Sequence, residues 1–230
     1  MAEFFETTVF FGVLISLASY GLGMVLKKKL RLAIFNPLLV AIALVVVFLL
    51  VFDMDYETYQ GSAKYLSYFL TPATVCLAIP LYEQFERLRK NAAAVIVGIT
   101  TGVITSLSSV LLLSCIFGLS HADYVTLLPK SITTAIGMGV SDELGGYVAI
   151  TVAVIITTGI LGNMIAELVC KIFRITHPIA KGIGIGSASH AIGTTKAMEL
   201  GETEGAMSSL SIVVSGFLTV ILAGIFANFM

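Results

Sequence analysis

The 230-residue chain is 57% hydrophobic and only 12% charged, about half the charged fraction of a typical globular domain. This composition excludes a soluble or secreted fold and indicates an all-α protein with several helices that cross a bilayer. The net charge of −1 gives no basis for a nucleic-acid partner.

The first apolar run, Thr7–Leu26, is long enough to cross, because a spanning helix needs roughly 20 mostly apolar residues. Its basic cluster, Lys27–Lys29 with Arg31, follows the run instead of preceding it, which is not the order of a cleaved signal peptide. Lys and Arg accumulate on the cytoplasmic side of membranes. We therefore expect residues 1–31 to form an N-terminal helix and basic loop, with the N-terminus outside.

Residues 32–119 form the first of two predicted repeats. Leu32–Phe52 is a plain span, Gly61–Tyr82 an interrupted one, and Asn91–Leu119 another plain one. The interruption has a local cause, because Pro72 and Pro80 each remove a backbone donor and disfavour helical geometry at the residue before them. Two hydroxyl side chains stand beside the break: Thr71 and Thr74.

Residues 120–143 contain a shorter apolar stretch, Leu127–Val140, which is too short to cross. Its flanks are expected outside, so it either dips into the membrane and returns or lies on the surface as a loop. Irregular backbone at membrane depth needs protein or water to satisfy it. The run of small and hydroxyl residues favours re-entry and gives four candidate site residues: Lys130, Ser131, Thr133 and Thr134.

Residues 144–230 form the second predicted repeat. Leu144–Cys170 and Glu204–Met230 are plain spans, and Ala180–Leu200 is interrupted by glycines that each lower helix propensity by about 1 kcal/mol relative to Ala. Such interrupted segments, at matching positions in two inverted halves, point to a transporter binding site near the midplane. The small polar residues of this second break are Ser187, Ser189, His190, Thr194 and Thr195.

The charge pattern predicts that Ala180–Leu200 crosses the membrane. With about seven crossings, the N-terminus outside and the C-terminus inside, ten of the 13 basic residues are cytoplasmic and most acidic residues are not. The two repeats then run in opposite directions, as an inverted 3+3 pair with two broken helices. The alternative for the broken segments is that their small residues only let helices pack closely.

Three basic residues fall outside the cytoplasmic set: Lys64, which neighbouring tyrosines mark as an interfacial anchor, and the two candidate site residues Lys130 and Lys196. A charge at membrane depth costs around 2.5–3.5 kcal/mol on insertion scales and is by default a functional hypothesis. The two ammonium groups are candidates to bind a carboxylate; the alternative is ion pairing with Asp142, Glu143 or Glu199. His190 is either a structural histidine or the carrier of a coupled proton, because histidine titrates near neutral pH.

Enzymatic and metal-binding motifs are missing from the sequence. The glycine-rich KGIGIGS run lacks the spacing of a dinucleotide site. Cys76, Cys115 and Cys170 are widely spaced within apolar runs and are expected to be inert. We expect no catalytic residue, no cofactor and no metal.

Several motifs resemble the LrgB/CidB family of bacterial membrane proteins, in the same order over nearly the whole chain. The PKSITT and ASHAIGT segments are the most specific, although Ala135 stands where the family pattern leads us to expect proline. The matching segments are Asn36–Leu39, Leu70–Thr74, Ala78–Tyr82, Pro129–Thr134, Gly186–Thr194 and Glu204–Leu210.

This resemblance implies two different functions. One is transport of small 2-oxo or 2-hydroxy acids such as pyruvate, glycolate or glycerate. The other is antiholin-like control of murein hydrolases and cell lysis, with a small LrgA/CidA-type membrane partner. The two-halved arrangement of broken helices favours transport, by alternating access and with a proton or cation as a candidate coupling ion. We expect a homo-oligomer in a bacterial plasma membrane.

Overall fold

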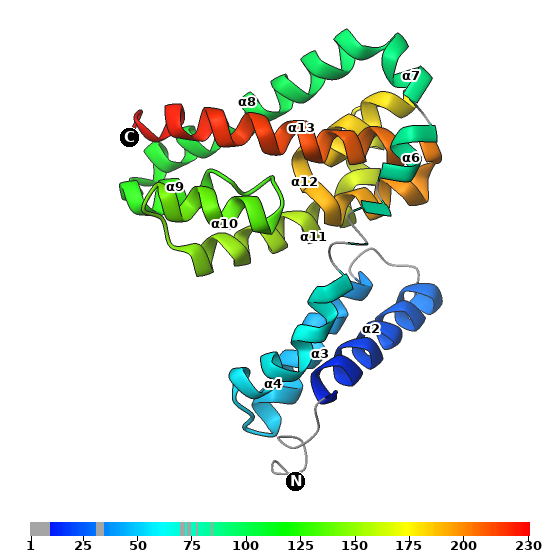
Figure 1. Cartoon of the computed structure of the whole chain (residues 1–230), viewed down its shortest axis with the longest axis vertical. Coiled ribbons are helices and arrows are strands. Elements are labelled where there is room, and N and C mark those ends of the chain that lie inside the picture. Colours follow the sequence, from blue (N-terminus) through cyan, green and yellow to red (C-terminus); the bar gives the residue numbers. More distant parts are fainter. Residues whose placement is uncertain (1–9, 31–34, 70–71, 73–74, 77, 84) are drawn as a thin grey trace. The chain divides into compact units, whose positions relative to one another are not determined.

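The computed structural model describes residues 10–30, 35–69, 72, 75–76, 78–83 and 85–230. These residues form helices, turns and short connections, and no strand occurs among them. The chain divides into two compact units, Met1–Cys76 and Leu77–Met230 (Figure 1).

The first unit contains two packed helices, α2 (Phe11–Leu30) and α3 (Pro37–Val51), followed by α4 (Tyr56–Ala63) and the 3₁₀ helix η1 (Lys64–Phe69). Asn36 caps α3, since its side-chain oxygen accepts from the Leu38 amide at 2.9 Å. Ser62 joins α4 to α2 by accepting from the Gly12 amide at 2.8 Å. The predicted span Leu32–Phe52 is represented by α3, whose 15 residues are fewer than a perpendicular crossing needs.

The described elements of the second unit follow one another in the order α6 (Ala78–Glu83), α7 (Phe85–Lys90), α8 (Ala92–Phe117), α9 (His121–Leu127), α10 (Thr134–Glu143), α11 (Val148–Ile172), α12 (Pro178–Leu200) and α13 (Glu202–Ala227). Among the described residues, the helices long and apolar enough to cross a membrane are α2, α8, α11 and α13.

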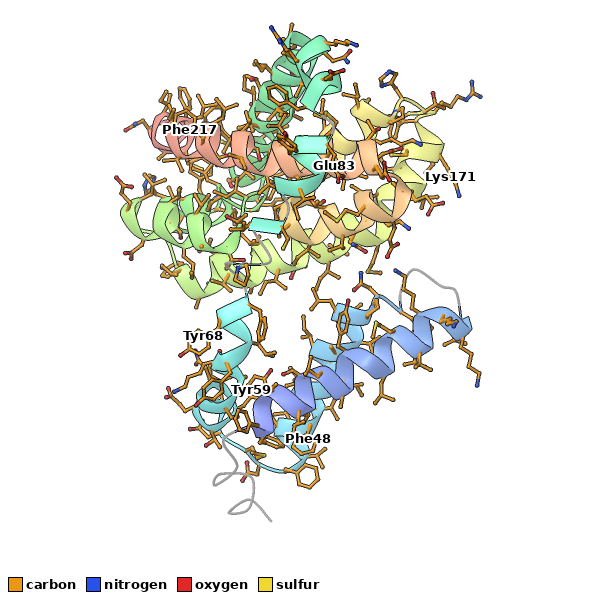
Figure 2. The ribbon with its side chains drawn as sticks, turned by 45° about the vertical axis from the view of Figure 1, so that its right-hand side comes forward. Phe48, Tyr59, Tyr68, Glu83, Lys171 and Phe217 are labelled. Carbon is orange, nitrogen blue, oxygen red and sulfur yellow. The ribbon has the colours of Figure 1, made fainter. Side chains whose placement is uncertain are left out.

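Large apolar side chains cover the outside of the long helices. Phe217 on α13 is 67% exposed (Figure 2), and Leu112 on α8 and Leu161 on α11 are likewise exposed. Soluble proteins seldom expose apolar surface on this scale. Polar residues gather on the opposite, buried face of α13, where Ser208, Ser211 and others are enclosed. This inside-out distribution agrees with a protein embedded in lipid.

The helix α12 reverses direction at His190, which has φ 42° and ψ −141°. Its first arm (178–189) runs parallel to α13: Gly182 lies against Glu204 and Met207, and Gly186 lies against Ser208.

The second arm of α12 (191–200) runs antiparallel to α13. Thr194 bonds Ser208, whereas Met198, further along the arm, contacts Gly205. Because the two arms take opposite directions along one neighbouring helix, α12 is a re-entrant hairpin.

The predicted crossing of Ala180–Leu200 is therefore wrong. Lys181 and Leu200, from the two ends of α12, line the same pocket as Lys171. The predicted placement of the C-terminus on the same side as these basic residues is wrong as well. The helix α13 begins at the end of the unit that carries them, so its C-terminal end lies at the opposite end. The prediction failed because it weighed Glu199 and Glu202 in assigning sides, although acidic residues contribute little to orientation.

The segment between α8 and α11 forms a second hairpin (residues 121–143), which enters from the other side. At its base, Tyr124 donates to the Phe226 carbonyl at 2.8 Å. At its tip, Ser131 lies 3.0 Å from Ser106, near the middle of α8, and α10 then returns until Ser141 bonds Thr151 at the start of α11. The structure agrees with the re-entrant alternative for Leu127–Val140 and not with a surface loop.

An inverted pair is thus present within the second unit. The helix α8 with the hairpin 121–143 corresponds to α11 with the hairpin α12, because each long helix is followed by a hairpin that re-enters from the side where that helix ends. The predicted pairing of residues 32–119 with 144–230 stays a prediction. Thr71 and Thr74, in the first predicted break, lie outside the described residues.

The hairpin assignment predicts the sidedness of three exposed positions. In a background without native cysteines, Thr176→Cys and Glu202→Cys should react with a membrane-impermeant maleimide from the same side, and Asp142→Cys from the opposite side. Thr176 precedes α12 and Glu202 follows it, so a crossing α12 would separate their labelling. Reaction of Glu202→Cys together with Asp142→Cys would contradict the hairpin.

A second prediction concerns the packing of α11 on α12. A Cβ at Gly162 would overlap the side chain of Ser189, so Gly162→Ala should lower the free energy of unfolding in detergent by about 1–3 kcal/mol. A methyl group at Gly184, on the same hairpin, would have no neighbour within 4 Å, so Gly184→Ala serves as the matched control and should stabilise slightly. The double variant Gly162→Ala/Ser189→Gly should recover most of the loss; equal stability of the two single variants would disprove this packing.

Candidate functional site

The two hairpins meet on α11 at Ile155, which is fully buried: the second hairpin through its tip, and the first through the first turn of its returning helix α10. From the hairpin 121–143, Gly137 packs directly against the Ile155 side chain. From α12, the His190 ring nitrogen Nε2 lies 3.0 Å from the Ile155 carbonyl oxygen. Two segments that enter from opposite sides are thus brought to one position inside the membrane-embedded unit.

The tip of the first hairpin carries a half-buried ammonium group. Lys130 Nζ donates to Ser131 Oγ at 3.0 Å, and Ser131 Oγ lies 3.0 Å from Ser106 Oγ on α8. Within the described ranges no carboxylate pairs with Lys130, so the predicted alternative of an ion pair with Asp142 or Glu143 is not present. Its described partners leave the charge without a counterion.

Thr133 and Thr134 mark the start of the returning helix α10. Thr133 is the N-cap residue by position, and its carbonyl accepts from the Gly137 amide at 2.8 Å. Thr134 is the first residue of α10. The structure therefore places both threonines beside the Lys130–Ser131 tip, at the point where the backbone stops being irregular and becomes helical.

The tip of the second hairpin is a chain of hydrogen bonds around His190. A carbonyl oxygen only accepts, so His190 Nε2 carries the proton that bonds Ile155. Thr194 Oγ1 donates to the His190 carbonyl at 2.9 Å, and its remaining contact at 2.7 Å is therefore a bond donated by Ser208. All three side chains are almost fully buried. The bonds fix the reversal, and among the described residues the other His190 ring nitrogen has no hydrogen-bond partner.

Ser187 and Ser189 face glycines on the neighbouring helices. Ser187 donates to the Ile183 carbonyl of its own arm at 2.7 Å and lies against Gly102 of α8. Ser189 lies against Gly162 of α11. These contacts fit the predicted alternative in which small residues allow close helix packing.

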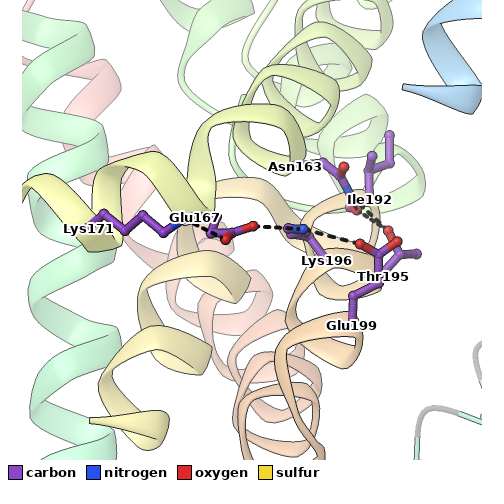
Figure 3. Close-up of polar contacts among 7 residues, drawn as sticks. All are labelled: Asn163, Glu167, Lys171, Ile192, Thr195, Lys196 and Glu199. Carbon is purple, nitrogen blue, oxygen red and sulfur yellow. Dashed lines mark hydrogen bonds and ion pairs between the residues drawn. The ribbon is translucent and has the colours of Figure 1, made fainter. Parts of the chain in front are cut away.

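Thr195 and Lys196 lie away from the tip, in a polar cluster between α11 and the second arm (Figure 3). Asn163 Nδ2 donates to the Ile192 carbonyl at 2.9 Å and to Thr195 Oγ1 at 2.8 Å. The cluster thus ties the second arm of α12 to α11.

Lys196 is an ion-pair residue in this cluster. Its Nζ is 3.2 Å from an oxygen of Glu167 and 3.2 Å from one of Glu199, while the other Glu167 oxygen pairs with Lys171 at 2.9 Å (Figure 3). The predicted alternative, a pair with Glu199, is confirmed for Lys196. The structure does not bring Lys196 together with Lys130.

Three contributors to the site are not evident from the sequence alone. From the sequence, Ser106 is explained by close helix packing, and nothing distinguishes Ser208 from the other serines of its span. Glu167 is explained by an ion pair with Lys171, four residues further along the same helix. One signal was available: Ser208, Ser211 and Ser215 repeat at helical spacing within an apolar span, which marks a polar face. The partners across helices required the tertiary structure.

Known proteins resemble the chain over almost its entire length. The model of the LrgB-like family matches residues 16–229. The antiholin-like protein LrgB of Bacillus cereus (strain B4264) is 39% identical over 223 residues, which are 96% of this chain and 97% of that protein, and that of Bacillus anthracis (strain A0248) gives the same values. No solved structure matches. The chain therefore belongs to the LrgB-like family of membrane proteins.

Proposed function

We propose that this chain is a membrane carrier for small carboxylates, which bind between the tips of the two hairpins. The observation that carries the proposal is the meeting of two oppositely directed re-entrant hairpins at Ile155. Non-helical backbone at membrane depth is tolerated where protein buries it or a cavity needs it. Inverted repeats with broken helices at the midplane are the arrangement of many secondary transporters.

The charge at the tips favours a small anion as the substrate. Lys130 brings one positive charge, for which the described residues offer only hydroxyl partners, and a lysine at membrane depth costs about 2.5–3.5 kcal/mol on insertion scales. A carboxylate that binds there would offset this cost. Ser131, Ser106 and Thr134 supply hydroxyl groups around it, which suit a 2-oxo or 2-hydroxy acid such as pyruvate, glycolate or glycerate.

Alternating access follows from the two-sided construction. Each hairpin is open to a different side at its base, so movement of one hairpin away from α11 exposes the tips to one side only. His190 is the candidate carrier of a coupled proton, because Ile155 holds one ring nitrogen and no described residue bonds the other. Lys196 is held in its ion-pair cluster and is not part of the proposed substrate site.

A second candidate is antiholin-like regulation of murein hydrolases and lysis, together with an LrgA/CidA-type partner. The observation that favours it is the name of the relatives, which are 39% identical and are called antiholin-like. That name supports regulation of lysis more directly than it supports transport. Both functions place the chain in a bacterial plasma membrane, and both are compatible with a homo-oligomer.

The carrier proposal predicts saturable uptake of labelled pyruvate, glycolate or glycerate by proteoliposomes that contain this chain alone, measured with and without a pH gradient. Lys130→Met should reduce uptake about tenfold or more, because a hydrogen bond to a charged group contributes about 1.5–3 kcal/mol. Lys90→Met, which removes an exposed lysine from α7, is the matched control and should leave uptake unchanged.

The same variants separate the two candidate functions. Absence of uptake by the wild type, both alone and with an LrgA-type partner, would contradict the carrier proposal. Regulation of lysis would then be the remaining candidate function. Lysis measured in cells that carry Lys130→Met then tests the link between the activities: if control of lysis follows from transport, both should be lost together.

A further inference from the structure

A pocket of about 450 Å³ lies at the basic end of the second unit, apart from the hairpin tips. It lies between the C-terminal end of α11, the start of the first arm of α12 and the end of the second arm. Figure 2 shows Lys171 at the edge of the second unit. The pocket is lined by Glu167, Cys170, Lys171, Arg174, Ile175, Thr176, Lys181 and Leu200.

The side chains around the pocket carry an excess of positive charge. Lys171, Arg174 and Lys181 contribute three positive charges and Glu167 one negative charge, which leaves a net charge of 3 − 1 = +2. Both oxygens of Glu167 are already engaged by lysines. In the part of the chain that the structure describes, no carboxylate pairs with Arg174 or Lys181.

The backbone holds Arg174 at the pocket in a conformation that few residues adopt. Its φ is +54°, and the turn is closed by the Ile175 amide, which donates to the Cys170 carbonyl at 2.8 Å. Glycine or asparagine is the usual residue at such a left-handed position after a helix. Arginine is less stable than glycine in this backbone conformation. What it adds at the position is its guanidinium group.

We propose that this pocket binds a phosphate monoester group. A phosphate monoester carries about −1.5 to −2 charges near neutral pH, which matches the net +2, whereas a monocarboxylate supplies only −1. The guanidinium of Arg174 suits bidentate contact with phosphate oxygens. The apolar walls from Cys170, Ile175 and Leu200 accommodate the carbon atoms next to the phosphate.

Two sources share this chemistry: the headgroup of phosphatidic acid and a free phosphate ester from the aqueous phase. Basic pockets between helices on the cytoplasmic side are suited to anionic headgroups. In either case the bound group contacts Lys181 from the first arm of α12 and the end of α11 together. It would therefore hold the base of the hairpin to α11.

The test is the thermal unfolding midpoint of the full chain in a nonionic detergent, titrated with inorganic phosphate and, separately, with short-chain phosphatidic acid. Ionic strength is kept constant with chloride. A ligand that binds the folded chain raises the midpoint. Arg174→Asn and Lys181→Gln should each weaken binding about tenfold, and Lys90→Gln, the matched control, should not change it. Asparagine tolerates the left-handed backbone, so the first variant is expected to fold.

The outcomes assign the source or overturn the proposal. A saturable response to phosphatidic acid alone assigns a lipid headgroup, and a response to inorganic phosphate as well assigns a free phosphate ester. Leu200→Trp, which fills the pocket and keeps every charge, should abolish either response. No response to either probe, or equal weakening by Lys90→Gln, would overturn the site. The result is independent of whether the chain transports carboxylates.

Discussion

A chain that turns around within hydrocarbon exposes backbone groups that lipid cannot satisfy, and each such group costs several kcal/mol. In the second hairpin, side chains of the hairpin bond the backbone at the reversal and fix it to α11, and a side chain of α13 supports them. His190, at the reversal, donates to the Ile155 carbonyl, and Thr194 returns a bond to the His190 carbonyl. Ser208 of α13 completes this series of hydrogen bonds by donating to Thr194 Oγ1. The position of the tip, and with it the candidate binding site, depends on these neutral hydrogen bonds.

Close approach of the surrounding helices is the second requirement, and it depends on pairs of glycine and serine. Gly102 of α8 meets Ser187, Gly162 of α11 meets Ser189, and Gly186 of the hairpin meets Ser208 of α13. A larger residue at any of these glycines displaces an arm. Because packing in membranes relies on such small contacts and not on expulsion of water, the hairpin is held from three sides by neighbours of nearly fixed separation.

The sequence was sufficient for the helical membrane class, for the interrupted segment that contains His190 and for the Lys130–Ser131 tip. It was not sufficient for the path of α12. Four glycines surround the break, yet the reversal occurs at His190, a residue for which positive φ is unfavourable and which tertiary hydrogen bonds hold in place. Likewise, the i+3 partner Glu199 of Lys196 could be predicted locally, whereas Glu167 lies on another helix and became visible only in the structure.

The two ends of the second arm are held by forces of different kinds. Its tip is fixed by buried, uncharged hydrogen bonds, and its base by the Lys196–Glu167 and Lys196–Glu199 pairs, whose carboxylates are 45% and 49% exposed. Mobile ions screen exposed charges over about 8 Å at physiological ionic strength and have little effect on enclosed neutral groups. A rise in ionic strength on one side of the membrane therefore weakens the base of this arm and leaves its tip unchanged.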